Sequence, residues 1–221
     1  MNRENLEELK KKLPVTPGIH GRGEYPTSVV MVLLAEIDDE YHFVLQERNA
    51  KIRQGGEVCF PGGMFDEGTD LSPGETAIRE TTEELGLPPE KIEIIGRLDT
   101  LVAAMGAVIE IFVGVMNSDI ASLEINRDEV EKVFTIPVTY FMETAPEIHQ
   151  VLIRLFSSEI DPKTSEEIVY LPVRELGLPE RYLDPWGNFK QNVYVFKTTD
   201  GIVWGLTARI IMDFIRVMKG E

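Results

Sequence analysis

The stretch that decides the fold reads Gly62-Gly63-Met64-Phe65-Asp66-Glu67-Gly68-Thr69-Asp70-Leu71-Ser72-Pro73-Gly74-Glu75-Thr76-Ala77-Ile78-Arg79-Glu80-Thr81-Thr82-Glu83-Glu84-Leu85-Gly86-Leu87. Its second half predicts a helix over about residues 73–85. Ser72 is a suitable N-cap, Pro73 fits the first helical position, and Glu75 completes a Ser-x-x-Glu capping box. Gly86 is a natural terminator because glycine adopts the left-handed conformation at low cost.

Three glutamates are the most informative feature of this helix. Glu80, Glu83 and Glu84 are spaced i, i+3 and i+4, and we assign them to its polar arc. The opposite arc, expected to face the core, consists of Ala77, Ile78, Thr81 and Leu85. Like charges at this spacing destabilise a helix, so the cluster needs a cation or free access to solvent. Carboxylates suit Mg²⁺, Mn²⁺ or Ca²⁺, but for the spacing alone a solvated acidic face is the favoured alternative.

The surrounding residues favour a metal site over a solvated acidic face, because they resemble the Nudix box. The helical half of the box reads R-E-U-x-E-E-x-G-U, with U apolar, and the matching residues are Arg79, Glu80, Glu83, Glu84, Gly86 and Leu87. Thr81 stands where the family has an apolar residue. The loop also departs from the family's G-x5-E-x7-R spacing. Asp70 is the acid nearest to the expected glutamate, with one extra residue on each side.

The resemblance implies an α/β fold in which a mixed β-sheet is sandwiched between α-helices. It also implies metal-dependent hydrolysis of a diphosphate bond, with Mg²⁺ or Mn²⁺ held by Glu80 and Glu84 and assisted by Glu83. Arg79 would hold the carboxylates from the flank. The general base would be a glutamate of the box or a later acid. Glu129 is the later candidate, and a solvated turn acid is an equal alternative for it.

The residues upstream resemble the coenzyme A diphosphatase branch of the family, approximately L-L-T-x-R-[SA]-x3-R-x3-G-x3-F-P-G-G. The matching residues are Arg48, Arg53, Gly56, Phe60, Pro61, Gly62 and Gly63. Asn49 replaces a small residue, and one residue is missing between Arg53 and Gly56. Two further runs resemble the branch, Glu129–Val138 and Ile202–Ile210.

This second resemblance implies hydrolysis of coenzyme A or an acyl-CoA to 3′,5′-ADP and a 4′-phosphopantetheine product. Arg48, Arg53, Gly62 and Gly63 are the expected substrate-binding residues, and either arginine could pair with the 3′-phosphate. Two other functions remain open. One is a hydrolase of ADP-ribose or another nucleoside diphosphate sugar, and the other is a Nudix-fold binding or regulatory domain without turnover.

The composition of the chain limits the classes of partner that we expect it to bind. The 221 residues carry a formal charge of −16, which repels the phosphate backbone, so nonspecific nucleic-acid binding is not expected. The longest apolar stretch, Leu101–Met116, is interrupted by Glu110 and is too short for a membrane helix. The single cysteine, Cys59, cannot form an internal disulfide. We expect a cytoplasmic protein that binds a small nucleoside-diphosphate substrate without a membrane, and a homodimer is a possible assembly.

The chain divides into two expected parts. Residues 1–26 should form an N-terminal helix, at about 2–13, and a loop, and residues 27–221 a Nudix hydrolase domain. Strands are expected at about 28–34, 42–46, 92–98, 107–115, 130–136 and 193–196. A helix is expected at about 204–218. The segment of about 139–192, which contains scattered prolines, is predicted to be an irregular insertion or extension.

Overall fold

The computed structural model describes residues 2–16, 18–104 and 106–221, so part of the expected N-terminal loop lies outside the described residues. The α-helices are α1 (Arg3–Lys12), α2 (Pro73–Leu85), α3 (Val138–Glu143) and α4 (Gly205–Met218). Short 3₁₀ turns are η1 (Arg22–Glu24), η2 (Pro89–Lys91), η3 (Ile120–Ser122) and η4 (Glu180–Tyr182). No described helix is both long and apolar enough to cross a membrane.

The main sheet contains eight strands and is mixed. They are β1 (Thr27–Ile37), β2 (Glu40–Arg48), β3 (Val58–Cys59), β4 (Gly62–Met64), β5 (Ile92–Arg97), β6 (Leu101–Ala103), β7 (Ala107–Met116) and β8 (Val130–Pro137). The central pair, β1 and β7, is parallel. The other pairs, including β1 with β2 and β4, and β2 with β3 and β8, are antiparallel. The longer strands expected from the sequence are confirmed, as is the mixed sheet.

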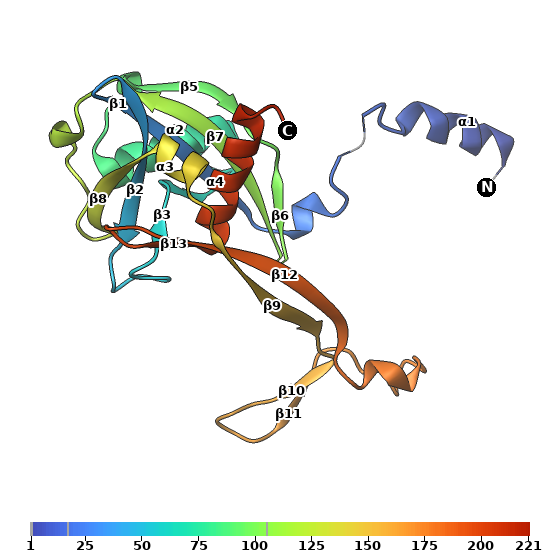
Figure 1. Cartoon of the computed structure of the whole chain (residues 1–221). Coiled ribbons are helices and arrows are strands. Elements are labelled where there is room, and N and C mark those ends of the chain that lie inside the picture. The colour runs from blue at the N-terminus through green and yellow to red at the C-terminus, as the bar shows by residue number, and fades with distance from the viewer. Residues whose placement is uncertain (1, 17, 105) are drawn as a thin grey trace.

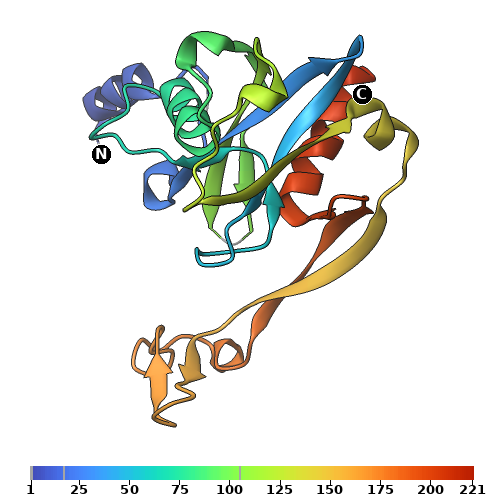
Figure 2. The same ribbon diagram turned by 90° about the vertical axis from the view of Figure 1, so that its left-hand side faces the viewer.

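Helices cover both faces of this sheet, as Figure 2 shows, with α2 on one side and α4 on the other. Successive residues of a strand point to opposite faces, and β1 follows this rule. Met31 and Leu33 pack in a cluster with Leu85 of α2. Val32 and Leu34 pack in a second cluster with helix α4, represented by Ile211. Two buried clusters on one strand therefore confirm the expected sandwich.

Helix α2 begins and ends where the sequence predicts. The Ser72 side chain accepts a hydrogen bond from the Glu75 N–H, and Gly86 caps the end with φ of 66°. Thr81 is buried, and its hydroxyl donates to the Ala77 carbonyl at 2.7 Å, so it tolerates a position that favours apolar residues. One expectation is wrong: Glu84 is buried and not on the exposed arc. Glu84 follows Ala77 by seven residues, nearly two full turns, and therefore shares its buried face.

The prediction that residues 139–192 are irregular is also wrong. This part of the chain contains α3 and the strands β9 (Glu147–Leu155), β10 (Ser158–Ile160) and β11 (Glu167–Val169), and β12 (Trp186–Lys197) begins there. Strands β9 and β12 pair antiparallel as a long ribbon, and β13 (Ile202–Trp204) joins β12 at its base. We call residues 147–197 the arm. Figures 1 and 2 show the arm projecting from the rest of the molecule, with β10 and β11 at its far end.

The predicted N-terminal helix is confirmed as α1, and none of its residues is buried. Figure 1 shows α1 standing away from the sheet. Its stability rests on local features: Asn2 caps its first turn, and lysines occupy its last turn, where cations are favoured by the helix dipole.

Candidate active site

Glu84 is the most deeply placed carboxylate of the candidate site. It is 4% exposed, and its Oε2 accepts a hydrogen bond of 3.0 Å from the backbone N–H of Gly62. Burial raises the pKa of Glu84 to about 7, the hydrogen bond from Gly62 lowers it, and the neighbouring charge of Glu80 raises it. Ionised Glu84 is therefore costly unless a cation accompanies it.

Glu80 lies directly over strand β4, which contains the glycine pair Gly62-Gly63. A Cβ added to Gly63 would stand 2.3 Å from the Glu80 carboxylate, closer than any real contact allows. A Cβ at Gly62 would stand equally close to the carbonyl of Val29. The two glycines thus let β4 pass between β1 and the carboxylates. Partial burial, opposed by the charge of Arg79, raises the pKa of Glu80 as well.

Arg79 holds the carboxylates from the side. Its Nε and Nη2 contact the two oxygens of Asp70 at 2.9 and 3.0 Å. Its Nη1 contacts Glu80 Oε1 at 2.9 Å and Glu83 Oε2 at 3.0 Å. Asp70 is buried and also accepts a hydrogen bond of 2.9 Å from the Thr76 hydroxyl. The Arg79 hydrogen bonds hold the pKa of Asp70 well below its usual range. The two-oxygen contact with Asp70 fixes the Arg79 guanidinium beside the carboxylates of α2.

Glu83 and Glu129 lie at the outer side of the site. The Glu83 side chain is 53% exposed, and its ion pair is with Arg79. Glu129 is exposed, and its charge contributes to raising the pKa of Glu80, so it lies within electrostatic range of this carboxylate. The Glu129 carbonyl accepts a hydrogen bond of 2.8 Å from the N–H of Asn49, which ties the two loops together.

The two arginines expected to bind substrate lie in different surroundings. The charge of Arg48 lowers the pKa of Glu84, so the two side chains lie within electrostatic range of each other. Its Nε also donates to the carbonyl of Arg53 at 3.3 Å. Arg53 is exposed on the loop after β2, and its side chain makes no ion pair within the described residues. The geometry therefore brings Arg48, Gly62, Gly63, Arg79, Glu80 and Glu84 together and leaves Arg53 at the rim.

The donors fit a divalent cation by their chemistry. Glu80 and Glu84 offer carboxylate oxygens, which Mg²⁺ and Mn²⁺ prefer, and both have raised pKa values that a nearby cation would offset. In the described part of the chain, no three His, Cys, Asp or Glu side chains converge on one point as a complete metal site. A cation would therefore need ligands beyond these two carboxylates, and substrate phosphate oxygens are such ligands.

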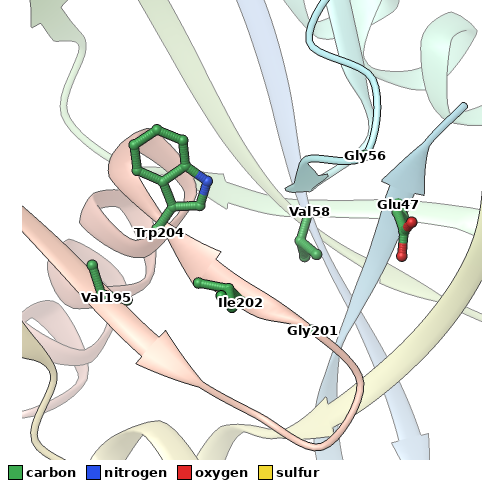
Figure 3. A pocket seen from close by; sticks show the side chains of 7 residues that line it. All are labelled: Glu47, Gly56, Val58, Val195, Gly201, Ile202 and Trp204. Atoms are coloured by element: carbon green, nitrogen blue, oxygen red, sulfur yellow. The ribbon is translucent and has the colours of Figure 1, made fainter. Parts of the chain in front are cut away.

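An open cavity of about 430 Å³ lies on the side of β3 that points away from Glu84. Figure 3 shows Val58 of β3 and Glu47 of β2 facing Val195, Ile202 and Trp204 of β12 and β13. Consecutive strand residues point to opposite faces, so Val58 faces this cavity, whereas the next residue, Cys59, lies on the side of Glu84. The run that begins at Ile202 has a structural role here. It starts α4, whose Thr207 hydroxyl donates to the Val58 carbonyl at 3.0 Å.

Sequence reasoning missed two features near the site, a buried glutamine and a group of two arginines on a buried glutamate. Gln46 is 1% exposed and lowers the pKa of Glu84, but a glutamine within an expected strand gave no signal. Arg22 and Arg97 converge on Glu110, which is 1% exposed. A signal existed for this group, because Glu110 interrupts the longest apolar stretch, and a charge inside such a stretch requires a partner.

Comparison with known proteins agrees with this architecture. The NUDIX domain model matches residues 25–185. The chain is 31% identical over 169 residues to an uncharacterized Nudix hydrolase of Pectobacterium atrosepticum, covering 76% of this chain and 70% of that one.

Two further relatives match over shorter regions. The chain is 36% identical to Nudix hydrolase 3 of Caenorhabditis elegans and 36% identical to a peroxisomal coenzyme A diphosphatase of Mus musculus. Each match covers 52% of this chain, and it spans 49% and 48%, respectively, of those proteins, or about half their length. With the matched domain, the sandwiched sheet and the carboxylates of α2 in place, the chain belongs to the Nudix family.

Proposed function

We propose that this chain hydrolyses the diphosphate bond of a nucleoside-diphosphate derivative with the help of Mg²⁺ or Mn²⁺. The observation that carries the proposal is the pair of sequestered carboxylates, Glu80 and Glu84, against the Gly62-Gly63 backbone. A protein that only binds its ligand gains nothing from two crowded carboxylates with raised pKa values. Their burial costs free energy that a bound cation and an anionic substrate would offset.

Each residue of the site receives a role in this proposal. Glu80 and Glu84 hold the metal, and Glu83 assists from the exposed side. When bound, the metal supplies Lewis-acid stabilisation of charge on the diphosphate oxygens and helps to activate water. Arg79, fixed by Asp70, orients Glu80 and Glu83. Glu129, which is exposed and within electrostatic range of Glu80, is the proposed general base.

The proposed substrate is coenzyme A or an acyl-CoA. Support comes from the sequence signature around Arg48 and from similarity to two proteins named peroxisomal coenzyme A diphosphatases, at 36% and 30% identity. Arg48 lies beside Glu84, so we assign it to the phosphates of the bond that is cleaved. Arg53, at the rim, would make a weaker contact. ADP-ribose remains the rival substrate.

The decisive experiment is a panel of coenzyme A, acetyl-CoA, 3′-dephospho-coenzyme A and ADP-ribose, with products identified by mass. Each substrate is assayed with Mg²⁺, with Mn²⁺ and with EDTA. We expect hydrolysis of coenzyme A to 3′,5′-ADP, its loss with EDTA and its return with added metal. ADP-ribose as the best substrate would overturn the coenzyme A assignment. Absence of cleavage under every condition would favour a binding domain.

Two arginine variants test the assignment of substrate contacts. Arg48→Ala should lower kcat/KM for every diphosphate in the panel by roughly ten- to a hundredfold, because a charge-assisted contact to the reacting group is lost. Arg53→Ala is the matched control from the same loop and should have a smaller effect. Equal effects of the two variants would contradict the separation of Arg48 from Arg53.

A further inference from the structure

Two arginines share one buried carboxylate at the edge of the α2 face, by which we mean the face of the main sheet that helix α2 covers. Glu110 of β7 is 1% exposed, and its two oxygens contact Arg22, next to β1, and Arg97, at the end of β5. The Thr100 hydroxyl donates to Glu110 Oε2 at 3.0 Å. One arginine would be enough to neutralise Glu110, so the second leaves the group with a net positive charge.

Both guanidinium groups retain donors that face solvent. The Arg22 and Arg97 side chains are 45% and 52% exposed. Within the described residues, their one further side-chain hydrogen bond is from Arg97 to Thr100, at 3.4 Å. An arginine has five N–H donors, so several remain for a ligand. A half-exposed cationic pair fixed by a buried carboxylate is preorganised for an anion, and it lies in a chain whose net charge is −16.

Sheet register places this pair on the same face as the carboxylates of α2. Gly63 of β4, Val29 of β1 and Glu110 of β7 are direct neighbours across three strands. Side chains of such neighbours share a face, and Glu80 lies over the Cβ position of Gly63. Two strand spacings, about 10 Å, separate the backbone beneath Glu80 from the backbone of Glu110.

A second contact locates Arg97 relative to α2. The Arg97 guanidinium stacks over the ring of Phe112, with 5.5 Å to its centroid. The same ring lies 3.5 Å from the Cβ position of Gly74, in the first turn of α2. Arg97 is therefore beside the N-terminal end of the helix that carries Glu80. This end of a helix also favours negative charge.

We propose that Arg22 and Arg97 form a binding subsite for a phosphate monoester of the substrate, separate from the diphosphate that is cleaved. The subsite takes a nucleotide that carries a second phosphate group, such as the 3′-phosphate of coenzyme A, while Arg48 contacts the diphosphate. Guanidinium groups suit this ligand because they bind phosphate oxygens in a bidentate manner. The choice of coenzyme A as the example rests on the proposed function, whereas binding of a bisphosphate nucleotide does not.

The first test measures binding without turnover. Adenosine 3′,5′-bisphosphate and adenosine 5′-monophosphate are titrated calorimetrically into the full chain in EDTA. Arg22→Gln and Arg97→Gln should each weaken binding of the bisphosphate about tenfold and leave the monophosphate unchanged. Arg216→Gln is the matched control, because Arg216 on α4 is also 52% exposed and pairs with an acid. Unchanged bisphosphate binding in both test variants overturns the proposal.

Glu110→Gln separates ligand binding from a purely structural role. This substitution keeps an oxygen acceptor for the arginines but removes the opposing charge, so bisphosphate binding should be retained or strengthened. Arg97→Lys, which keeps the charge and loses the bidentate geometry, should fall between the wild type and Arg97→Gln. Circular dichroism checks that each variant is folded. Loss of bisphosphate binding in folded Glu110→Gln, to the same extent as in Arg97→Gln, would contradict the proposal.

Kinetics distinguish failure of the subsite from failure of the proposed function. Arg97→Gln should reduce the preference for coenzyme A over 3′-dephospho-coenzyme A by roughly ten- to a hundredfold, mostly through KM. If coenzyme A is cleaved and the preference does not change, the subsite is wrong and the hydrolase stands. If nothing is cleaved but bisphosphate binding depends on both arginines, the subsite stands and the hydrolase is wrong.

Discussion

The sheet that carries the site and the arm use similar residues and bury them very differently. Strand β1 has seven apolar residues in its centre, Val29–Ala35, and all but Val30 are fully buried between α2 and α4. Strand β9 of the arm is also rich in apolar residues, but only Ile153 is partly buried. Arm residues such as Leu152, Leu155 and Phe189 are 50–59% exposed.

The difference shows that residue type alone does not set burial. A second layer is needed, and the sheet has one on each face. Helix α4 packs on β12 only at the base of the ribbon, around Phe196, and apolar side chains farther out, such as Leu152 and Phe189, stay exposed. Two-stranded ribbons are marginal in water, so the arm depends on its base, where Phe196 is buried among the residues of α4 and α3. Chemistry that needs fixed geometry is accordingly concentrated on the sheet and α2.

The largest expected effect is on catalysis. Glu80→Gln and Glu84→Gln should each lower kcat/KM at least about a thousandfold, because a metal ligand is lost. The fold should persist, and the melting temperature of Glu84→Gln should be equal or higher without metal, since a buried charge is removed. Glu159→Gln, an exposed acid of the arm, is the control and should retain full activity. Activity at the wild-type level in either α2 variant would refute the assignment of the metal ligands.

The second expected effect is on stability. Leu33→Ala, at a fully buried position of β1, should lower the free energy of unfolding by about 2–5 kcal/mol. Leu152→Ala, in the arm, should change it by less than about 0.5 kcal/mol. Urea denaturation followed by circular dichroism measures both. A large loss in Leu152→Ala would show that another molecule covers the arm, and sedimentation would then test whether it is a second copy of this chain.

A smaller effect on activity is expected at Asp70, which holds Arg79 in place. Asp70→Asn should lower activity by roughly ten- to a hundredfold, because the residue that orients the carboxylates is itself less firmly held. The pKa of Asp70 is lowered in the folded protein, so its stabilising contribution is complete above its unfolded pKa of about 4 and is lost as the pH falls. Acid denaturation should therefore be steeper for the wild type than for Asp70→Asn. Parallel acid profiles would contradict the assigned role of Asp70.

The smallest effect is expected at the surface of the arm. Glu147 contacts Lys197 at 2.6 Å and His149 at 3.2 Å, and all three side chains are about half exposed or more. Exposed pairs contribute little because water and salt screen them. Lys197→Ala should cause no resolvable shift in the denaturation midpoint. A clear shift would indicate that this end of the arm is more constrained than its exposure suggests.

Much of the fold could be predicted because local rules and tertiary packing agree there. The caps at Ser72 and Gly86 fixed the limits of α2, and two short apolar runs joined by the polar turn Asp38-Asp39-Glu40 indicated the strands β1 and β2. The arm could not be predicted in the same way. Its prolines and turn residues suggested irregular structure, and apolar residues on both faces of β9 give no alternation from which a strand can be recognised.

The candidate site was predicted only in part, for a physical reason. The glutamates and Arg79 follow one another on a helix, so their spacing determines their relative positions. Gln46, Arg22 and Arg97 come from strands and a loop that are distant in the sequence, and only the sheet brings them to the α2 face. The burial of Glu84 follows from its seven-residue spacing to Ala77, whereas its charge pointed to an exposed position.

The Asp70–Arg79 contact has a consequence for the evolution of this loop. An aspartate is one methylene group shorter than a glutamate, and here the shorter side chain accompanies a loop that is one residue longer on each side. Loop length and acid identity should therefore change together among relatives, with longer loops pairing with aspartate and shorter ones with glutamate. A search that fixes the count of residues would discard such chains. One that asks which acid can reach the guanidinium would retain them.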